Sequence, residues 1–278
     1  MTIFIFTLAI AGTSILAGFL GALTGLGGGV VIIPTLVLLF HVDIRYAIGA
    51  SLISVIATSS GAASAYVKEG FTNLRMGMFL EIATTAGALA GAFLAAKVAP
   101  NFIAIIFGGI LMYSAFASSH QAKKAVVLQP PDPLGTLLKL NGSYPEGKEE
   151  KSYSVYSVPA GFSLMFIAGT ISGLLGIGSG AVKVLAMDQA MRVPFKVSST
   201  TSNFMIGVTA AASAGVYLNR GYIDPGLAMP VMLGVLLGAV LGSHVLANAK
   251  TALLRKIFGF VLFALAIEMI YSGITGRL

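Results

Sequence analysis

The chain alternates between long apolar stretches and short polar segments, and the length of the apolar stretches indicates the fold class. Stretches of about 20 residues with few or no charges, long enough to cross a bilayer as an α-helix, recur along almost the whole sequence. Spans are predicted at residues 3–24, 47–67, 76–96, 102–118, 155–175, 197–218, 225–246 and 253–271. Two apolar pieces, 30–40 and 181–187, are too short to span alone. The pattern predicts an all-α, multi-pass membrane protein.

Composition supports this fold class and narrows the range of partners. Hydrophobic residues make up 56% of the chain and charged residues 10%, whereas soluble domains carry roughly 25% charged residues. The alternation typical of a β-barrel is absent, so helices must satisfy the backbone in lipid. The formal net charge is +7, but the basic residues do not form a cluster interleaved with aromatic residues. This distribution argues against nucleic acid as a partner and favours lipid headgroups or an anionic substrate. With no cysteine, disulfides and thiolate metal sites are excluded, and we expect no cofactor or metal.

A polar segment divides the chain into three parts. Residues 120–154 hold four prolines and nine charges of mixed sign, so this segment is predicted to lie outside the membrane. Tyrosine and valine recur at strand-like spacing in residues 139–144 and 152–158, which indicates a small β-hairpin. The predicted organisation is a first transmembrane repeat at 1–118, an extramembrane polar loop at 119–154 and a second transmembrane repeat at 155–278.

The second part repeats the first at a constant offset of 151 residues, without a gap. Of the 14 glycines between residues 17 and 118, 8 land on a glycine in the second half, against roughly two expected by chance. These 8 are Gly18, Gly25, Gly27, Gly29, Gly70, Gly87, Gly91 and Gly108. The offset predicts an internal duplication. Because the first apolar stretch matches residues 155–175, it is predicted to be part of the fold and not a removed signal peptide.

A glycine-rich segment interrupts each half at the same place. The two segments comprise Gly25, Gly27, Gly28 and Gly29 in the first half, and Gly176, Gly178, Ser179 and Gly180 in the second. Interruptions at corresponding positions of two halves point to a transporter binding site, since glycine lets the backbone approach a ligand and a helix N-terminus attracts anions. Close helix packing is the competing explanation for membrane glycines. It fits the small-xxx-small pairs Gly87 with Gly91 and Gly238 with Gly242.

Several motifs resemble those of the TauE/SafE family of sulfite and organosulfonate exporters. They are GALTGLGGGVVIIPTL at residues 21–36, GLLGIGSG at 173–180 and SNFMIGVTAAASA at 202–214, within a plan of two four-span halves joined by a polar loop. The resemblance covers nearly the whole chain. It implies a secondary permease for a small sulfur-containing or organic anion, such as sulfite or a sulfonate, in a prokaryotic cell (inner) membrane. The second segment has Ser179 where the first has Gly28, so we expect an asymmetric site.

Polar side chains near the second glycine segment are the candidates for anion binding. Lys183 lies three residues beyond the segment in an apolar context, and a lysine at membrane depth costs about 2.5 to 3.5 kcal/mol unless it is paired or hydrated. Snorkelling to the interface is the alternative. Thr201, Ser202 and Asn203 belong to a polar run at the start of the next span and offer hydroxyl and amide donors.

The first half offers fewer polar side chains. Ser51, Ser54 and Thr58 share one helical stripe and are predicted to line the path, with hydrogen bonding between or within helices as the alternative. Glu81 lies about one turn inside its span and is the candidate for coupling transport to H⁺. Two alternatives stay open: coupling to Na⁺, and an interfacial position of Glu81 without a role in coupling. Arg45 and Lys196 match in the repeat and suggest an electropositive vestibule.

Topology and function class each leave alternatives. If both short pieces re-enter, each half has four spans and the halves share one orientation; the positive-inside rule then places both termini and the polar loop outside. If both pieces cross, each half has five spans and the halves are inverted. An intramembrane enzyme would need a catalytic set, but the histidines lie at span ends or in the loop and the acids are scattered. A structural membrane subunit would explain packing glycines but not two matching breaks.

Overall fold

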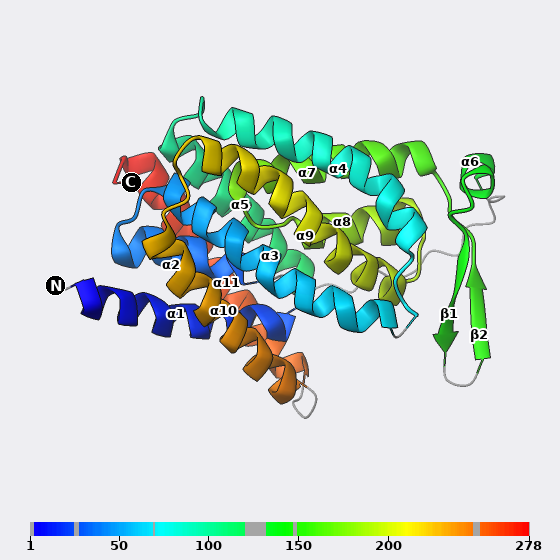
Figure 1. The fold of residues 1–278 in the computed structure, drawn as a ribbon, viewed down its shortest axis with the longest axis horizontal. Coiled ribbons are helices and arrows are strands. Elements are labelled where there is room, and N and C mark those ends of the chain that lie inside the picture. The colour runs from blue at the N-terminus through cyan, green and yellow to red at the C-terminus, as the bar shows by residue number, and fades with distance from the viewer. Residues whose placement is uncertain are drawn as a thin grey trace.

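The computed structural model describes residues 3–24, 28–68, 70–119, 132–146, 149–246 and 251–277. The protein is mostly helical (Figure 1). The helices of the first half are α1 (Ile3–Thr24), α2 (Gly29–Phe40), α3 (Ile44–Lys68), α4 (Leu74–Ala95) and α5 (Pro100–Ser119). Those of the second half are α7 (Val158–Leu175), α8 (Gly180–Leu185), the π-helix η1 (Ala186–Ala190), α9 (Phe195–Asn219), α10 (Pro225–Leu246) and α11 (Thr251–Thr275).

Three of the described helices are long and apolar enough to cross a membrane by length and composition: Leu74–Ala95, Val158–Leu175 and Pro225–Gly242. Large apolar side chains also face outward along the bundle. Phe4 is 74% exposed, and Leu8 and Leu16 on the same helix are 65% and 64% exposed. Such surfaces are rare on soluble monomers and are expected where lipid is the solvent. The fold is that of an all-α membrane protein, as the apolar pattern predicts.

Helices from the two halves pack against each other in pairs. The helix α1 packs along α10, α4 along α7, and α5 along α11, while α3 and α9 lie at the centre (Figure 1). Glycines make the tightest of these contacts possible. A Cβ added at Gly87 would overlap the carbonyl oxygen of Phe166, and one added at Gly173 would overlap that of Ala88. Packing is therefore the role of Gly87 and Gly91 on α4 and of Gly238 on α10.

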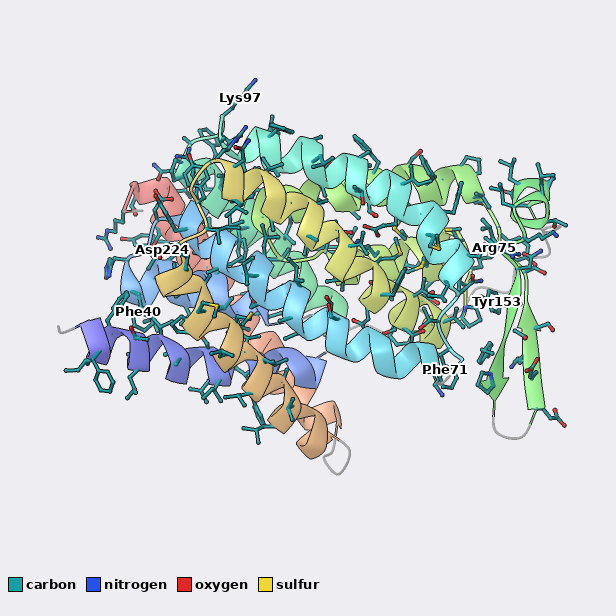
Figure 2. The ribbon with its side chains drawn as sticks, in the orientation of Figure 1. Phe40, Phe71, Arg75, Lys97, Tyr153 and Asp224 are labelled. Atoms are coloured by element: carbon teal, nitrogen blue, oxygen red, sulfur yellow. The ribbon has the colours of Figure 1, made fainter. Side chains whose placement is uncertain are left out.

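The chain ends and the polar loop lie at opposite ends of the bundle. Both termini lie at one end of the bundle, which we call the terminal end (Figure 1). The strands β1 (Gly142–Glu146) and β2 (Glu149–Tyr153) lie at the other end, the hairpin end (Figure 1). Phe40, Lys97 and Asp224 are at the terminal end, whereas Phe71, Arg75 and Tyr153 are at the hairpin end (Figure 2). The expectation that the termini and the loop share one side, which followed from four spans per half, is therefore wrong. The short helix α2 returns the chain to the end where α1 began, which adds a reversal of direction that apolar length alone did not predict.

The polar loop forms a small folded unit. The strands β1 and β2 pair antiparallel from Gly142 with Tyr153 to Glu146 with Glu149, so the predicted hairpin is confirmed with its strands closer to the turn. A short helix, α6 (Pro133–Leu137), precedes them. Residues 120–131 of the predicted loop lie outside the described residues.

Asn73 fastens the hairpin to the helix bundle. Its Nδ2 donates to the Leu140 carbonyl at 2.8 Å and to the Tyr153 hydroxyl at 2.7 Å, while its Oδ1 accepts from the Met76 N–H at 2.9 Å and caps α4. Burial raises the pKa of the Tyr153 phenol, an effect that the bond from Asn73 opposes. Because the pKa of Tyr153 is raised, docking of the hairpin is fully stable at pH values below the ordinary tyrosine pKa. This stability is lost as the pH rises above that value.

Replacing Asn73 by alanine is expected to lower the free energy of unfolding by about 1 to 2 kcal/mol, because an N-cap is lost and two acceptors lose their donor. The hairpin should then be cut faster by trypsin at Lys139 and Lys151. Ser143→Ala is the control, because that exposed hydroxyl bonds only within the hairpin, to Glu150. Equal cleavage rates in wild type and Asn73→Ala would show that other contacts hold the hairpin.

Candidate functional site

The second glycine segment is a sharp reversal between two helices. The helix α7 ends with Gly176 as its C-cap at φ 66°, and Gly178 follows at φ 70°. Side chains rarely adopt these left-handed angles, which is why glycine stands at both positions. Ser179 also has a positive φ of 45°, and α8 begins at Gly180. The chain thus turns back on itself inside the protein, between buried helices.

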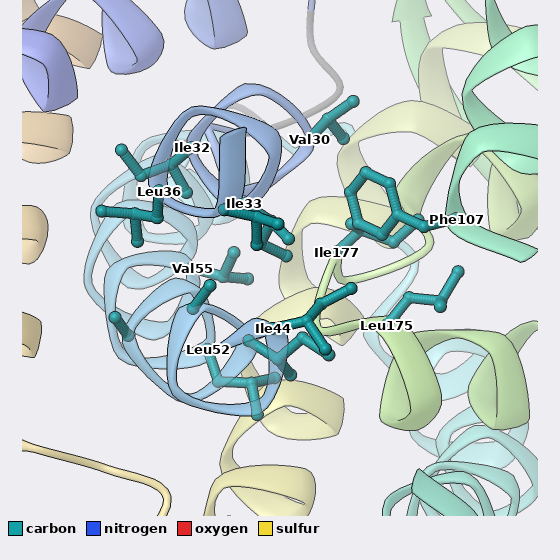
Figure 3. Packing of buried hydrophobic residues seen from close by; sticks show 14 of the residues in the cluster. Val30, Ile32, Ile33, Leu36, Ile44, Leu52, Val55, Phe107, Leu175 and Ile177 are labelled. Atoms are coloured by element: carbon teal, nitrogen blue, oxygen red, sulfur yellow. The ribbon is translucent and has the colours of Figure 1, made fainter. Parts of the chain in front are cut away.

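The first glycine segment is described in part. Gly25 and Gly27 lie outside the described residues. The Gly28 carbonyl accepts from the N–H groups of Val31 and Ile32 at 3.2 and 3.0 Å, which starts α2 at Gly29. Behind this start, the buried side chains of α2 pack toward α3, Phe107 and Ile177 (Figure 3). The apolar core therefore holds α2 close to the second segment.

The two segments meet in space. A Cβ added at Gly29 would lie 2.5 Å from the Ser51 Oγ and 3.3 Å from the carbonyl oxygen of Gly176, so Gly29 lies close against the second segment. The same carbonyl accepts a hydrogen bond from the Ser51 hydroxyl at 2.9 Å. Ser202 donates to the Gly180 carbonyl at 3.2 Å. The predicted residues Gly29, Ser51, Gly176, Gly180 and Ser202 therefore belong to one buried region.

Lys183 and Glu81 are joined beside this region by a residue that sequence analysis did not select. The Lys183 Nζ donates to the Thr209 Oγ1 at 2.5 Å, and that hydroxyl lies 2.6 Å from the Glu81 Oε1. The Thr85 hydroxyl donates to the same carboxylate oxygen at 3.0 Å. Lys183 is fully buried and Glu81 is 7% exposed, so neither is an interfacial, snorkelling charge. Thr209 is the repeat counterpart of the predicted Thr58, which is the signal that could have found it.

Three buried polar atoms near these groups have no hydrogen-bond partner in the described part of the chain: the Ser172 Oγ, the Ser179 Oγ and the Glu81 Oε2. Burying a polar atom without a partner costs about 1 to 3 kcal/mol, so such atoms mark places where a ligand can complete the bonding. Ser172 was not predicted, because its counterpart is Gly21 and a lone serine in a span gives no signal. The two hydroxyls flank the reversal at Gly176 and Gly178.

The remaining predicted residues lie elsewhere or bond locally. Ser54 donates to the Ser51 carbonyl at 2.8 Å and Thr58 to the Ser54 carbonyl at 3.0 Å, both within α3. Thr201 accepts from the Asn73 N–H at 3.0 Å, at the hairpin end of α9. Asn203 is half-buried on the same helix. The hydrogen bonds of Ser54 and Thr58 thus stay within α3, and that of Thr201 leads to the hairpin end. None of these bonds joins the reversal at Gly176 and Gly178.

Both ends of the bundle carry basic side chains against aromatic rings. The Arg45 guanidinium lies 5.7 Å from the centre of the Tyr222 ring, and the Lys196 ammonium lies 3.8 Å from that of Phe71. Since Phe71 is at the hairpin end (Figure 2) and Arg45 also bonds the Val98 carbonyl beside Lys97, the two cations do not share one vestibule. At the hairpin end, a cavity of about 270 Å³ is lined by Arg75 and Lys139 among other residues.

Comparison with known proteins decides the family. The model of the family described as "Sulfite exporter TauE/SafE" matches residues 10–269, nearly the whole chain. The chain belongs to the TauE/SafE family. As a member of this family, it is an integral membrane transporter.

Curated relatives agree with this assignment. The probable membrane transporter protein YunE of Bacillus subtilis (strain 168) is 27% identical over 267 residues, covering 94% of this chain and 96% of the relative. YdhB of the same organism, also named a probable membrane transporter protein, is 26% identical over 231 residues, covering 82% and 84%. A probable membrane transporter protein of Xylella fastidiosa (strain 9a5c) is 27% identical over 268 residues, covering 94% of each chain. No solved structure matches this transporter.

Proposed function

We propose that this transporter is a secondary permease for a small sulfur-containing or organic anion, such as sulfite or a sulfonate, in a prokaryotic inner membrane. The observation that carries the proposal is the meeting of the two glycine segments, where Gly29 approaches the Gly176 carbonyl. Irregular backbone at membrane depth is tolerated where protein surrounds it or where it lines a substrate path. The anion would bind on this irregular backbone, between the halves.

The donors around the second segment favour an anion over a neutral or cationic ligand. The unpartnered hydroxyls of Ser172 and Ser179 can each donate one hydrogen bond to an oxyanion. The fully buried Lys183 supplies a positive charge on the helix that follows. The first half contributes Gly28 and Gly29 but no corresponding cation, so the site is asymmetric, with most anion-directed groups in the second half.

We infer two related halves of opposite orientation, an arrangement that would allow alternating access. A Cβ at Gly18 would overlap the Val235 carbonyl, and one at Gly169 would overlap the Thr84 carbonyl. The two contacts correspond, because Gly169 lies 151 residues after Gly18 and Val235 lies 151 residues after Thr84. The helix α1 starts at the terminal end and α7 at the hairpin end (Figure 1). We infer an inverted repeat with five helical segments per half, with the parts bounded at 1–118, 119–154 and 155–278. Inverted repeats of this kind rock around a fixed central site.

In this mechanism, each of the two cation–aromatic contacts would close the substrate path at one end of the helix bundle. Arg45 and Lys196 are 151 residues apart, as are Phe71 and Tyr222, so the contact at one end has its counterpart at the other. Breaking one contact while keeping the other would open the protein to one side only. An anion would meet a positive charge at whichever end is open.

The orphan hydroxyls give the most selective test of the site. We expect Ser179→Ala and Ser172→Ala each to raise the KM for anion uptake in proteoliposomes roughly 10- to 100-fold, because a hydrogen bond to a charged group is worth about 1.5 to 3 kcal/mol. Neither substitution removes a hydrogen bond between described residues, so the unfolding temperature should not fall. Labelled sulfite and labelled methanesulfonate are the substrates.

Ser60→Ala is the matched control, because this exposed hydroxyl bonds only the Ile56 carbonyl of its own helix. An unchanged KM in the double variant Ser172→Ala, Ser179→Ala would contradict the proposed site. Failure of the wild type to move sulfite, methanesulfonate or a simple carboxylate would contradict the proposed substrate class.

A further inference from the structure

We propose that Glu81, Thr209 and Lys183 form a proton-coupling relay, in which one proton binds to the Glu81 carboxylate each time one monovalent anion binds beside Lys183. The inference rests on the proposed anion transport and adds the coupling ion, its residue and its ratio. It is carried by the geometry of three buried side chains from α4, α9 and α8, which are far apart in sequence and adjacent in the protein.

The charges of Lys183 and Glu81 balance each other through Thr209. The Lys183 ammonium donates to the Thr209 hydroxyl at 2.5 Å, and the Thr209 hydroxyl donates to the Glu81 Oε1 at 2.6 Å. One hydroxyl oxygen therefore separates a buried positive charge from a buried negative charge. Each charge offsets the desolvation penalty of the other, which in isolation would be severe.

An arriving anion disturbs this balance. Once the anion pairs with Lys183, the ammonium charge is neutralised by the ligand, and Glu81 becomes a buried negative charge without a cation. The low-cost response is protonation. The Glu81 Oε2 is the acceptor, because it is buried and unpartnered in the described structure, whereas Oε1 already accepts from Thr209 and Thr85. The proton comes from water on the open side, and the loaded site is neutral again.

The Thr209 hydroxyl can change its hydrogen-bond acceptor when Glu81 is protonated, without a movement of its oxygen atom. Its hydroxyl oxygen lies 2.9 Å from the Met205 carbonyl one turn back on α9, as well as 2.6 Å from the Glu81 Oε1. A single hydroxyl proton can serve only one of these acceptors at a time. When Glu81 is protonated, the hydroxyl can donate to Met205 and still accept from Lys183. Thr209 is thus a positioning residue that links the two charge states.

Other ionisable groups do not supply the missing charge. The helix α7, which packs along α4, carries none in its sequence. On α9, Lys196 lies over the Phe71 ring and the Arg220 guanidinium over the Phe93 ring, and Tyr217 is near Tyr222. On α4 itself, Arg75 is exposed at the hairpin end (Figure 2). On η1, beyond α8, Asp188 is half-buried, and its acidic side chain cannot supply a cation.

Sodium fits this place less well than a proton. Hard cations need several oxygen ligands at once, and the Glu81 Oε1 already accepts hydrogen bonds from Thr209 and Thr85. The ammonium of Lys183, one hydroxyl away from the carboxylate, would also repel Na⁺. A proton needs only one free carboxylate oxygen, which Glu81 provides.

The test uses reconstituted full-length protein with methanesulfonate, a monoanion that itself carries no titratable proton near neutral pH. Exchange of labelled for unlabelled methanesulfonate measures transport without net movement. Uptake driven by an inside-alkaline pH gradient, with a trapped pH dye, measures coupling. For the wild type we expect exchange, uphill uptake, one proton per anion and no response to a membrane potential, because the loaded site is neutral.

For Glu81→Gln we expect uphill uptake and anion-linked proton entry to fall more than 10-fold, while exchange falls much less. Glu268→Gln is the matched control, since Glu268 is exposed on α11, and it should behave as wild type. Uphill uptake on a pH gradient by Glu81→Gln would overturn the relay. A wild type that exchanges methanesulfonate but shows no proton entry during net uptake would also overturn it, even if Glu81→Gln failed to fold. Absence of wild-type exchange would contradict methanesulfonate transport instead.

Discussion

Replacing Lys183 by methionine is expected to reduce anion uptake more than 100-fold and to destabilise the protein by about 3 to 5 kcal/mol, as for other broken buried charge pairs. Methionine matches the length of the lysine stem but has no charge and no donor. Uptake fails because the anion loses its cation. Stability falls because the Thr209 hydroxyl loses its donor, at 2.5 Å, and Glu81 is left buried without a compensating charge.

The double variant Lys183→Met, Glu81→Gln separates these two effects. Removing both charges leaves no uncompensated charge in the interior, so we expect the unfolding temperature to recover toward that of wild type while uptake stays lost. The measurements are thermal unfolding in detergent and uptake of labelled methanesulfonate in proteoliposomes. A double variant no more stable than Lys183→Met would show that the two charges do not compensate each other.

Enlarging a packing glycine is expected to prevent the bundle from assembling. At Gly87 and Gly173 a new Cβ would overlap a carbonyl oxygen of the facing helix, and neither backbone can move without separating α4 from α7. We expect Gly87→Ala to lower stability by about 1 to 3 kcal/mol, as overpacking does. Gly87→Leu should give no monodisperse protein.

Gly215 on α9 provides a control at which the substitution by alanine is not expected to lower stability. This glycine is exposed, and an added Cβ would meet no atom within 4 Å, so Gly215→Ala should leave stability unchanged or raise it by about 0.5 to 1 kcal/mol through lost backbone freedom. Thermal unfolding and size-exclusion profiles of both variants check the prediction. Equal shifts at Gly87 and Gly215 would mean that helix propensity, and not helix contact, decides the effect.

The order and placement of the helices are features that sequence could predict. Apolar length located the helices within a few residues, since crossing a bilayer fixes the length of a helix. Left-handed backbone at Gly176 and Gly178 explains why the break shows in the sequence: glycine is the residue that accepts such angles. One charge in an apolar stretch also singled out Lys183, but only the structure shows that its side chain is buried. Each of these is a local property of the chain.

Which side chains meet was decided only by the tertiary structure. Thr209 joins Glu81, 128 positions away, to Lys183, 26 positions away, and Ser51 reaches Gly176 across 125 positions. Apolar periodicity shows that a helix has a buried face, but every helix in a bundle has one, and it does not say which faces pair. The placement of the termini opposite the hairpin also depended on the direction of α2, which returns the chain to the end where α1 begins (Figure 1). Local sequence sets where helices begin and end, whereas the charge pair and the unpartnered hydroxyls arise from close packing between helices.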